Sequence, residues 1–216
     1  MDQFILKVCK GCSFIDVGPL WGMEKLSIAY KAGATKLAAI DIMPKDDLLW
    51  TNLTSKLGPV SGGIDYICGD VCNLRERSYD VVHCSGVLYH HPNPLLFFKT
   101  LHRISNNYVL LGTTVTSNVV KNRFGIVNIT PGAALFLPAV PENNMKILRK
   151  DWELWLDGRP GDILSEENIN WDIDNLQHWW WLFTREYVEA LASLVGFEIQ
   201  KSECENRVLS LLLRKI

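Results

Sequence analysis

Short apolar runs rich in β-branched residues recur along the first half of the chain, and segments with helical spacing separate them. The runs are residues 13–17, 36–41, 64–68, 79–84 and 107–115. Helical spacing marks residues 23–32 and 92–104, and the second of these begins with Pro-Asn-Pro, which suits a helix start. Apolar strands that alternate with helices are typical of parallel βαβ units. The first half of the chain therefore predicts a parallel sheet covered by helices.

The alternation stops after residue 115 and resumes near the end of the chain. Thr184 can cap a helix that runs to Val195, Gly196 can end this helix, and residues 197–201 and 208–214 indicate two closing strands. Residues 116–183 lie between, with several prolines and no clear period. A structureless loop of that length is improbable in a compact domain, so this insertion is predicted to be a small subdomain or lid with its own helices.

Length and composition favour one domain. The chain has 216 residues, 48% of them hydrophobic, which is enough for one substantial core but short of two independent domains. We predict an α/β fold with a doubly wound, mostly parallel, seven-stranded Rossmann-like sheet. The single domain spans residues 1–216 and carries a Trp-rich insertion before the last helix.

The insertion holds six of the eight tryptophans of the chain. They are Trp152, Trp155, Trp171, Trp179, Trp180 and Trp181. These rings could wall a substrate pocket or form the core of the insertion. Consecutive side chains cannot all face inward on one element, so at least one of the last three should meet the main domain or a ligand. Packing is the interpretation we favour.

Charge and hydropathy limit the kinds of partner that the chain can bind. A net charge of −2 and a pI near 6.2 leave no global excess of positive charge to attract a polyanion, which favours a small-molecule partner over nucleic acid. The first apolar stretch ends at Lys7 and is too short for a signal-peptide core, and no run approaches the roughly 20 apolar residues that cross a bilayer. We expect a cytoplasmic protein with no membrane partner.

The cysteines are scattered, and several lie in runs that predict buried strands. Their positions are 9, 12, 68, 72, 84 and 204. Cys9 and Cys12 have the spacing of a redox or zinc pair, but zinc would need a second pair, and Cys68 with Cys72 has the wrong spacing. We therefore expect reduced thiols and no metal site.

Polar residues and glycines follow the predicted strands on one side of the sheet. Residues 13–22 (SFIDVGPLWG) form a strand, a glycine turn and a helix start, where the backbone can approach a ligand. Asp41 ends the next strand, Asp70 follows the third and Ser85 ends the fourth. Each could have only a local role, with glycines that permit turns and acids that cap helices. Their ordered recurrence favours a cofactor site at the carboxyl edge, where ligands of such folds bind.

These residues resemble those of the class I S-adenosylmethionine-dependent methyltransferases. Asp16-Val17-Gly18 with Gly22 is similar to the first motif of that family, Asp41 to its ribose-binding acid, Gly69-Asp70 to its adenine-side acid, and residues 79–82 to its fourth strand. The resemblance covers nearly the whole chain and implies S-adenosyl-L-methionine as cofactor. It implies these cofactor-binding residues: Asp16, Gly18, Pro19, Gly22, Asp41, Ile42, Asp70, Val71, Cys84 and Ser85.

The resemblance also implies a role for each part of the edge. Asp16 would support the methionine end of the cofactor, Asp41 would hold the ribose, and Asp70 with Val71 would hold the adenine. Ser85 would border the methyl group. The Trp-rich insertion would close over the acceptor.

A narrower resemblance concerns the second half of the chain. Residues 86–95 (GVLYHHPNPL), 110–113 and 179–184, followed by Gly196-Phe197, resemble the branch that includes the wobble-uridine tRNA methyltransferases and related small-molecule enzymes. It implies methyl transfer to a small-molecule or nucleoside-type acceptor.

His90 and His91 follow the fourth strand, where an acceptor would face the methyl group. Either could remove a proton from an acceptor hydroxyl, because an imidazole with a pKa near 6.5 suits that work. His90 is the first choice and His91 the second. One of them could instead only orient the loop by hydrogen bonding.

Two other functions remain open on the sequence. A nicotinamide-dependent oxidoreductase shares the glycine turn and the ribose acid, but the chain lacks G-x-G-x-x-G and its first strand has Asp16 two residues before the glycine. A non-catalytic binding module of the same fold would bind the cofactor without transferring a methyl group.

Overall fold

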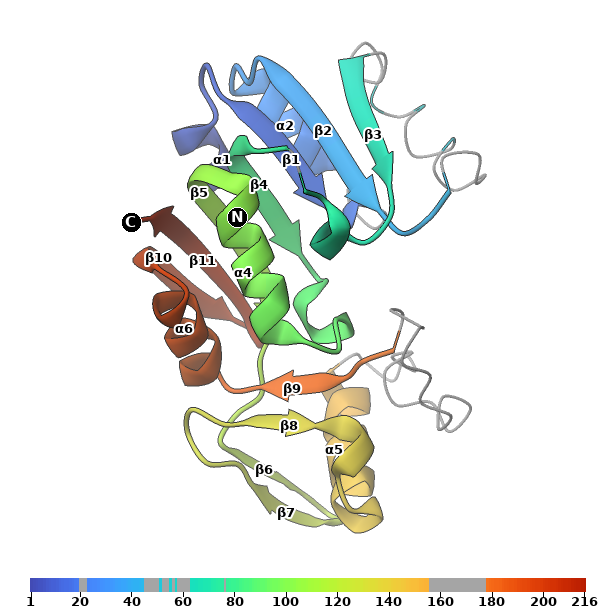
Figure 1. The fold of residues 1–216 in the computed structure, drawn as a ribbon. Coiled ribbons are helices and arrows are strands. Elements are labelled where there is room, and N and C mark those ends of the chain that lie inside the picture. The colour runs from blue at the N-terminus through green and yellow to red at the C-terminus, as the bar shows by residue number, and fades with distance from the viewer. Residues whose placement is uncertain are drawn as a thin grey trace.

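A seven-stranded sheet with the strand order β10-β11-β5-β4-β1-β2-β3 forms the centre of the computed structural model (Figure 1). The structure describes residues 1–19, 23–44, 51, 55, 57, 63–75, 77–155 and 178–216. The strands are β1 (Ser13–Val17), β2 (Lys36–Asp41), β3 (Ile64–Cys68), β4 (Tyr79–Ser85), β5 (Ser105–Thr114), β10 (Phe197–Glu205) and β11 (Val208–Lys215). β1 to β5 pair in parallel, whereas β11 is antiparallel to both β5 and β10. The predicted mostly parallel, Rossmann-like sheet is confirmed.

The strand boundaries agree closely with prediction over most of the sheet. β1, β2 and β3 have the predicted limits, and β4, β5 and β11 differ from theirs by one or two residues. β10 continues four residues beyond its predicted end at Lys201, and its second half is largely exposed. This half is an edge that pairs only with β11, so it carries polar residues and lacks the apolar run that marks a buried strand.

Helices cover both faces of the sheet. α4 (Pro94–Ile104) and α6 (Arg185–Leu194) lie on one face, and α1 (Asp2–Val8) and α2 (Glu24–Lys31) lie on the other (Figure 1). α1 was not predicted, because seven residues are too few to display a helical period. No helix among the described residues has both the length and the apolar character needed to span a membrane.

The predicted helix limits have identifiable chemical causes. The Asn93 side chain accepts a hydrogen bond from Leu96 N at 2.9 Å, and Pro94 occupies the first turn of α4. Thr184 caps α6 by accepting from Tyr187 N, and Gly196 follows the helix with φ +96°. A left-handed residue after a helix is a common stop signal, so the predicted end at Gly196 is confirmed.

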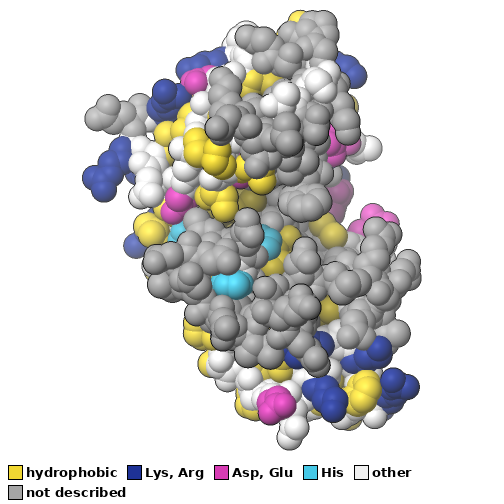
Figure 2. Space-filling model, turned by 90° about the vertical axis from the view of Figure 1, so that its right-hand side faces the viewer, with side chains coloured by type: hydrophobic (Ala, Val, Ile, Leu, Met, Phe, Trp, Pro, Cys, Tyr) yellow, Lys and Arg dark blue, Asp and Glu magenta, His cyan; other side chains and the backbone are white. Residues whose placement is uncertain are grey.

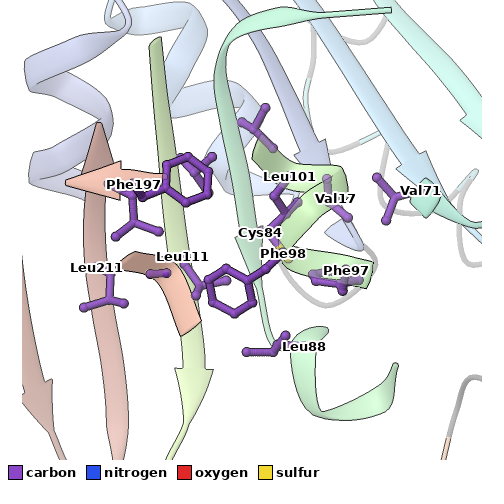
Figure 3. Packing of buried hydrophobic residues seen from close by; sticks show 14 of the residues in the cluster. Val17, Val71, Cys84, Leu88, Phe97, Phe98, Leu101, Leu111, Phe197 and Leu211 are labelled. Atoms are coloured by element: carbon purple, nitrogen blue, oxygen red, sulfur yellow. The ribbon is translucent and has the colours of Figure 1, made fainter. Parts of the chain in front are cut away.

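Each face of the sheet has its own hydrophobic core. On the α4–α6 face, Phe98 and Leu101 pack against Cys84, Leu111 and Leu211 (Figure 3). On the other face, the core joins α1 and α2 to the sheet through the following buried residues: Phe4, Ile5, Phe14, Leu26, Ala29, Ala39, Val81, Leu110 and Leu212. Burial on both sides explains why the strands are continuous apolar runs in the sequence.

The insertion combines short strands with one long helix. Its elements are β6 (Val119–Asn122), β7 (Gly125–Asn128), β8 (Ala134–Phe136), α5 (Glu142–Trp155) and β9 (Trp181–Phe183). β6 pairs with β7, and β8 pairs with β9. α5 agrees with the predicted helical content, but the strands were missed because three or four residues cannot display an alternation. In Figure 1 the insertion lies on the side to which the arrowheads of β1 to β4 point.

Candidate functional site

The carboxyl ends of four parallel strands bring the predicted residues to one edge of the sheet. Asp16 lies near the end of β1, Asp41 ends β2, and Ser85 ends β4. Backbone hydrogen bonds join these ends directly, from Gly18 N to Ile40 O at 2.9 Å and from Gly69 N to Asp41 O at 2.7 Å. The structure thus places the first-motif acid, the second-strand acid and the third-strand Gly-Asp turn on a continuous edge.

A cavity of about 360 Å³ opens at the β1–β4 part of this edge. Its lining consists of Asp16, Gly18, Pro19, Glu24, Lys25, His83, Ser85, Gly86, Tyr89 and His90. The volume lies within the roughly 300–1,000 Å³ of small-molecule sites. Five predicted site residues are in this lining, namely Asp16, Gly18, Pro19, Ser85 and His90. Figure 2 shows histidine side chains near the middle of the face that is turned towards the viewer.

A buried acid–histidine pair forms the floor of the cavity. His83 Nδ1 lies 2.6 Å from Asp16 Oδ1, and the two side chains are 3% and 2% exposed. Within the part of the chain that the structure describes, neither Asp16 Oδ2 nor His83 Nε2 has a hydrogen-bond partner. Buried polar atoms are almost always hydrogen-bonded, so two unsatisfied atoms beside a cavity indicate a place for a polar ligand.

The sequence analysis did not include His83 in the site. The parallel pairing of β1 with β4 puts His83 opposite Asp16, and this register cannot be derived from the sequence of either strand alone. The available signal was a single imidazole within an otherwise apolar strand.

Both the backbone conformation at position 18 and the side chain that packs against it require a glycine there. Its φ is +71°, in the left-handed region, and a Cβ at this position would overlap the side chain of Val87. The turn after β1 therefore passes directly against the loop after β4, with no room for a side chain between them.

The loop after β4 forms another wall of the cavity and is bound to the insertion. Trp180 N donates to Tyr89 O at 2.9 Å, and the rings of Tyr89 and Trp179 are 3.8 Å apart between centroids. Burial raises the pKa of Tyr89 to about 12, so its hydroxyl remains protonated and can donate a hydrogen bond. These contacts hold the aromatic segment before β9 against the wall of the cavity.

His90 is oriented by the same segment. Its Nδ1 lies 3.0 Å from His178 O. A carbonyl oxygen can only accept, so Nδ1 carries the proton and a neutral His90 has its lone pair on Nε2. This tautomer can accept a proton from an acceptor hydroxyl, which is the chemistry predicted for His90.

The β2–β3 part of the edge carries acids that bond to nearby backbone. Asp41 Oδ1 accepts from Met43 N at 3.1 Å, and Asp70 Oδ1 accepts from Cys72 N at 2.9 Å. Asp70 thereby caps the short 3-10 helix η3 (Val71–Asn73). Asp70 therefore has the local capping role that the sequence allowed for it. Its second carboxylate oxygen, Oδ2, is on the side of His91.

That second oxygen belongs to a cluster with His91. His91 Nε2 lies 3.9 Å from Asp70 Oδ2 and 3.4 Å from Cys72 Sγ. Burial alone would lower the pKa of His91, but its interactions with Asp70 and Cys72 raise this pKa to about 9. Burial alone would raise the pKa of Asp70, and the interactions with His91 and Cys72 lower it overall. His91 does not line the cavity, and its Nδ1 lies 2.9 Å from Asn93 O in its own loop.

Comparisons with known proteins add to this geometry. A family model described as "Methyltransferase domain" matches residues 15–107, from β1 to the start of β5. A magnesium protoporphyrin IX methyltransferase from Synechocystis PCC 6803, solved with bound S-adenosylhomocysteine, is 16% identical with a TM-score of 0.58, over 96% of this chain and 76% of that chain. An S-adenosylmethionine-dependent methyltransferase from Mesorhizobium loti is also 16% identical, with a TM-score of 0.59, over 99% of this chain and 95% of that one.

A third similar structure is a mitomycin 7-O-methyltransferase, at 11% identity and a TM-score of 0.58, over 100% of this chain and 53% of that chain. No curated protein sequence matches the chain. The family-model match and the structural likenesses agree on the architecture. The fold is that of a class I methyltransferase.

Within this methyltransferase fold, two predicted cofactor contacts need correction as to their side chains. The Cys84 thiol is fully buried in the α4–α6 core beside Leu101 and Phe98 (Figure 3), and Val71 is buried in the same core. Side chains alternate along a strand, so Cys84 faces the helices while His83 faces the opposite core and the cavity. Cys84 and Val71 can reach a ligand only through their backbone.

The predicted positions of the remaining residues can be assigned in part. Ile42 directly follows β2 and is 43% exposed, so its side chain is accessible from the edge. Gly22, Trp171 and the side chain of Trp155 lie outside the described residues. Trp152, Trp179 and Trp180 are buried, the first two in the core of the insertion, so the favoured packing role is confirmed for these rings.

Proposed function

We propose that this chain is an S-adenosyl-L-methionine-dependent methyltransferase that acts on a small-molecule or nucleoside-type acceptor. The observation that carries the proposal is the cavity at the carboxyl edge, which Asp16 and His83 line, each with one buried side-chain atom that has no partner among the described residues. The cofactor fits this lining, because its methionine end carries an ammonium whose hydrogen bonds the Asp16 carboxylate can accept. A sulfonium cofactor supplies an already activated methyl group.

The residues of the chain would then bind and orient the cofactor and the acceptor, and they would exclude water from the site. Asp16 would accept from the ammonium, and the glycine turn would let the backbone approach the methionine end. Asp41 would accept from the ribose hydroxyls, and Asp70 would accept from the adenine amino group. Ser85 and Gly86 would border the methyl group. Holding nucleophile, methyl carbon and sulfur in line supplies most of the rate in such a reaction.

The acceptor side of the site is the wall made by Tyr89 and His90. Neutral His90 can take a proton from an acceptor hydroxyl through Nε2, while His178 O holds its ring. The insertion belongs to the single domain and covers the acceptor, since its aromatic segment is hydrogen-bonded to this wall. Two similar structures carry names of enzymes for protoporphyrin and mitomycin, both small molecules, which supports this acceptor class over nucleic acid.

Calorimetric titration with S-adenosylmethionine, S-adenosylhomocysteine and NADH tests the proposal. We expect micromolar binding of both adenosyl ligands, no binding of NADH, and affinity about tenfold or more weaker in Asp41→Ala, since about 1.4 kcal/mol of lost hydrogen bonding corresponds to tenfold. Asp65→Asn is the control, because Asp65 lies on β3 of the same sheet and its side chain is in an exposed ion pair with Arg77. Binding of NADH without adenosyl binding would support the oxidoreductase alternative and contradict the proposal.

A second experiment addresses the acceptor. Release of S-adenosylhomocysteine is measured with the small-molecule fraction of a cell extract and, separately, with total tRNA. Turnover with the small-molecule fraction is the expected result. Turnover only with tRNA would support the narrower tRNA-enzyme resemblance, and cofactor binding without turnover on either pool would support a non-catalytic module.

A further inference from the structure

Three side chains of metal-binding type meet beyond the carboxyl end of β3. Asp70 and Cys72 come from the turn and the 3-10 helix that follow β3, and His91 comes from the loop after β4. Their ligand atoms lie within 4.8 Å of one another. The His91 side chain is 8% exposed and that of Asp70 is 24% exposed. The cluster is separate from the cavity lining described above.

The spacing of the donor atoms suits a tetrahedral ion. With Zn–S of about 2.3 Å and Zn–N and Zn–O of about 2.0–2.1 Å, tetrahedral angles put sulfur and nitrogen about 3.6 Å apart and nitrogen and oxygen about 3.4 Å apart. Cys72 Sγ and His91 Nε2 are 3.4 Å apart, and His91 Nε2 and Asp70 Oδ2 are 3.9 Å apart.

Neighbouring groups already hold the donors in position. Asn93 N donates to His91 Nδ1 at 3.0 Å, and Asn93 O lies 2.9 Å from the same nitrogen. These contacts direct His91 Nε2 towards Asp70 and Cys72. On metal binding the ion would replace the proton on Nε2, and Nδ1–H would donate to the Asn93 carbonyl, which is the usual arrangement of a metal-bound histidine. Asp70 Oδ1 accepts from Cys72 N, so Oδ2 is the oxygen directed at the cluster.

We propose that Asp70, Cys72 and His91 bind one divalent ion of the zinc class and leave a fourth position for water. A carboxylate, a thiolate and a neutral imidazole carry two negative charges, which match the charge of the ion. Cys72 also lines a second cavity of about 420 Å³, which gives solvent a path to the thiol. The expectation of no metal site rested on pairs of cysteines, whereas this cluster combines one cysteine with a histidine and an aspartate.

Titration of the reduced, chelator-treated full chain with Co²⁺ tests the site. We expect one equivalent to bind, with the near-ultraviolet thiolate-to-metal absorption and the visible bands of a four-coordinate ion, and Zn²⁺ should displace the cobalt. Cys72→Ser and His91→Gln should each weaken binding about 100-fold, since each removes one of three protein ligands. Cys68→Ser is the matched control, because Cys68 is an exposed free cysteine at the end of β3, just before this turn, and this variant should keep the bands.

The variants are paired with a measurement on the unaltered chain, so a folding defect does not decide the outcome. Zn²⁺ should protect Cys72 from alkylation, as mapped by mass spectrometry, and a chelator should restore its reactivity. Absence of a stoichiometric cobalt spectrum would overturn the proposal, as would a spectrum that survives in Cys72→Ser. Neither measurement uses the adenosyl cofactor, so this result is independent of the proposed function.

Discussion

The two parts of the carboxyl edge use the same residue types in opposite ways. In the β1–β4 part, Asp16 and His83 are buried, bond to each other, and leave one atom each without a partner among the described residues. In the β2–β3 part, Asp70 and His91 are more exposed as a pair and bond to the backbone of Cys72 and Asn93. The first part is therefore prepared for a polar ligand, whereas the second is already held by local bonds.

This difference shows that residue identity alone does not locate a binding site. In one place an acid next to a histidine is bonded to the backbone of its own loops and offers its remaining atoms to the proposed metal ion. In the other place the pair lines a cavity and has two buried side-chain atoms without a partner among the described residues. The burial of the pair and the number of atoms it leaves unsatisfied distinguish the two cases.

The largest expected effect is on stability at the first pair. His83→Ala should lower the free energy of unfolding by about 3–5 kcal/mol, because it leaves the Asp16 carboxylate buried without its partner. Chemical denaturation measures this loss, and the double variant Asp16→Asn, His83→Ala should regain part of it. His91→Ala should cost less, since the Asp70 side chain is 24% exposed. Equal losses of unfolding free energy in His83→Ala and His91→Ala would contradict the difference between the two pairs.

The glycine turn gives the next largest effect. Gly18→Ala should destabilise the protein by about 3 kcal/mol, from the left-handed backbone and the overlap with Val87 together. Gly11→Ala is the control, because Gly11 has a similar φ of +75° but has room for a Cβ. This substitution should lower the free energy of unfolding by only about 1 kcal/mol. Equal losses of unfolding free energy in the two variants, measured by denaturation, would mean that contact with the loop after β4 does not restrict position 18.

The second pair should make stability depend on pH. The pKa of His91 is raised from 6.5 to about 9, so the stabilisation is complete below pH 6.5 and is lost as the pH rises through about 9. In chelator-treated protein the loss should be about 2 kcal/mol, below the upper limit set by 1.36 kcal/mol per pKa unit. Denaturation midpoints of wild type and His91→Gln should converge above pH 9. A constant difference across this range would contradict the pairing.

The smallest expected effect is a coupling between cofactor binding and metal binding at the carboxyl edge. Asp70 is assigned both to the adenine of the cofactor and to the proposed metal ion, so each ligand should weaken the other by the same factor. We expect about tenfold weaker S-adenosylhomocysteine binding in saturating Zn²⁺, within the usual range of such coupling. Cys72→Ser should abolish the effect. Unchanged affinity in wild type would mean that the two ligands do not share the carboxylate.

Much of the fold could be predicted because its information is local. The strands of the sheet are apolar runs buried on both sides, and Asn93, Thr184 and Gly196 mark helix limits through their own chemistry. The edge location of Asp16, Asp41 and Asp70 followed from the rule that parallel strands end on one side.

The features that were missed depend on contacts distant in sequence. His83 joins the site through the β1–β4 register, and Cys72 meets His91 only because two loops converge. The short strands of the insertion are set by tertiary pairing, as in the β8–β9 pair, which spans the whole of α5. None of these contacts leaves a period or a motif in the sequence.

Calorimetric titration of Asp16→Asn with S-adenosylhomocysteine tests the central claim most directly. The substitution keeps the size of the side chain and removes the charge that receives the ammonium, so binding should weaken by about 10–100-fold, from about 1.5–3 kcal/mol for a hydrogen bond to a charged group. Asp65→Asn should bind as the wild type does. Unchanged affinity in a folded Asp16→Asn protein would show that the cofactor does not use the cavity floor and would contradict the account.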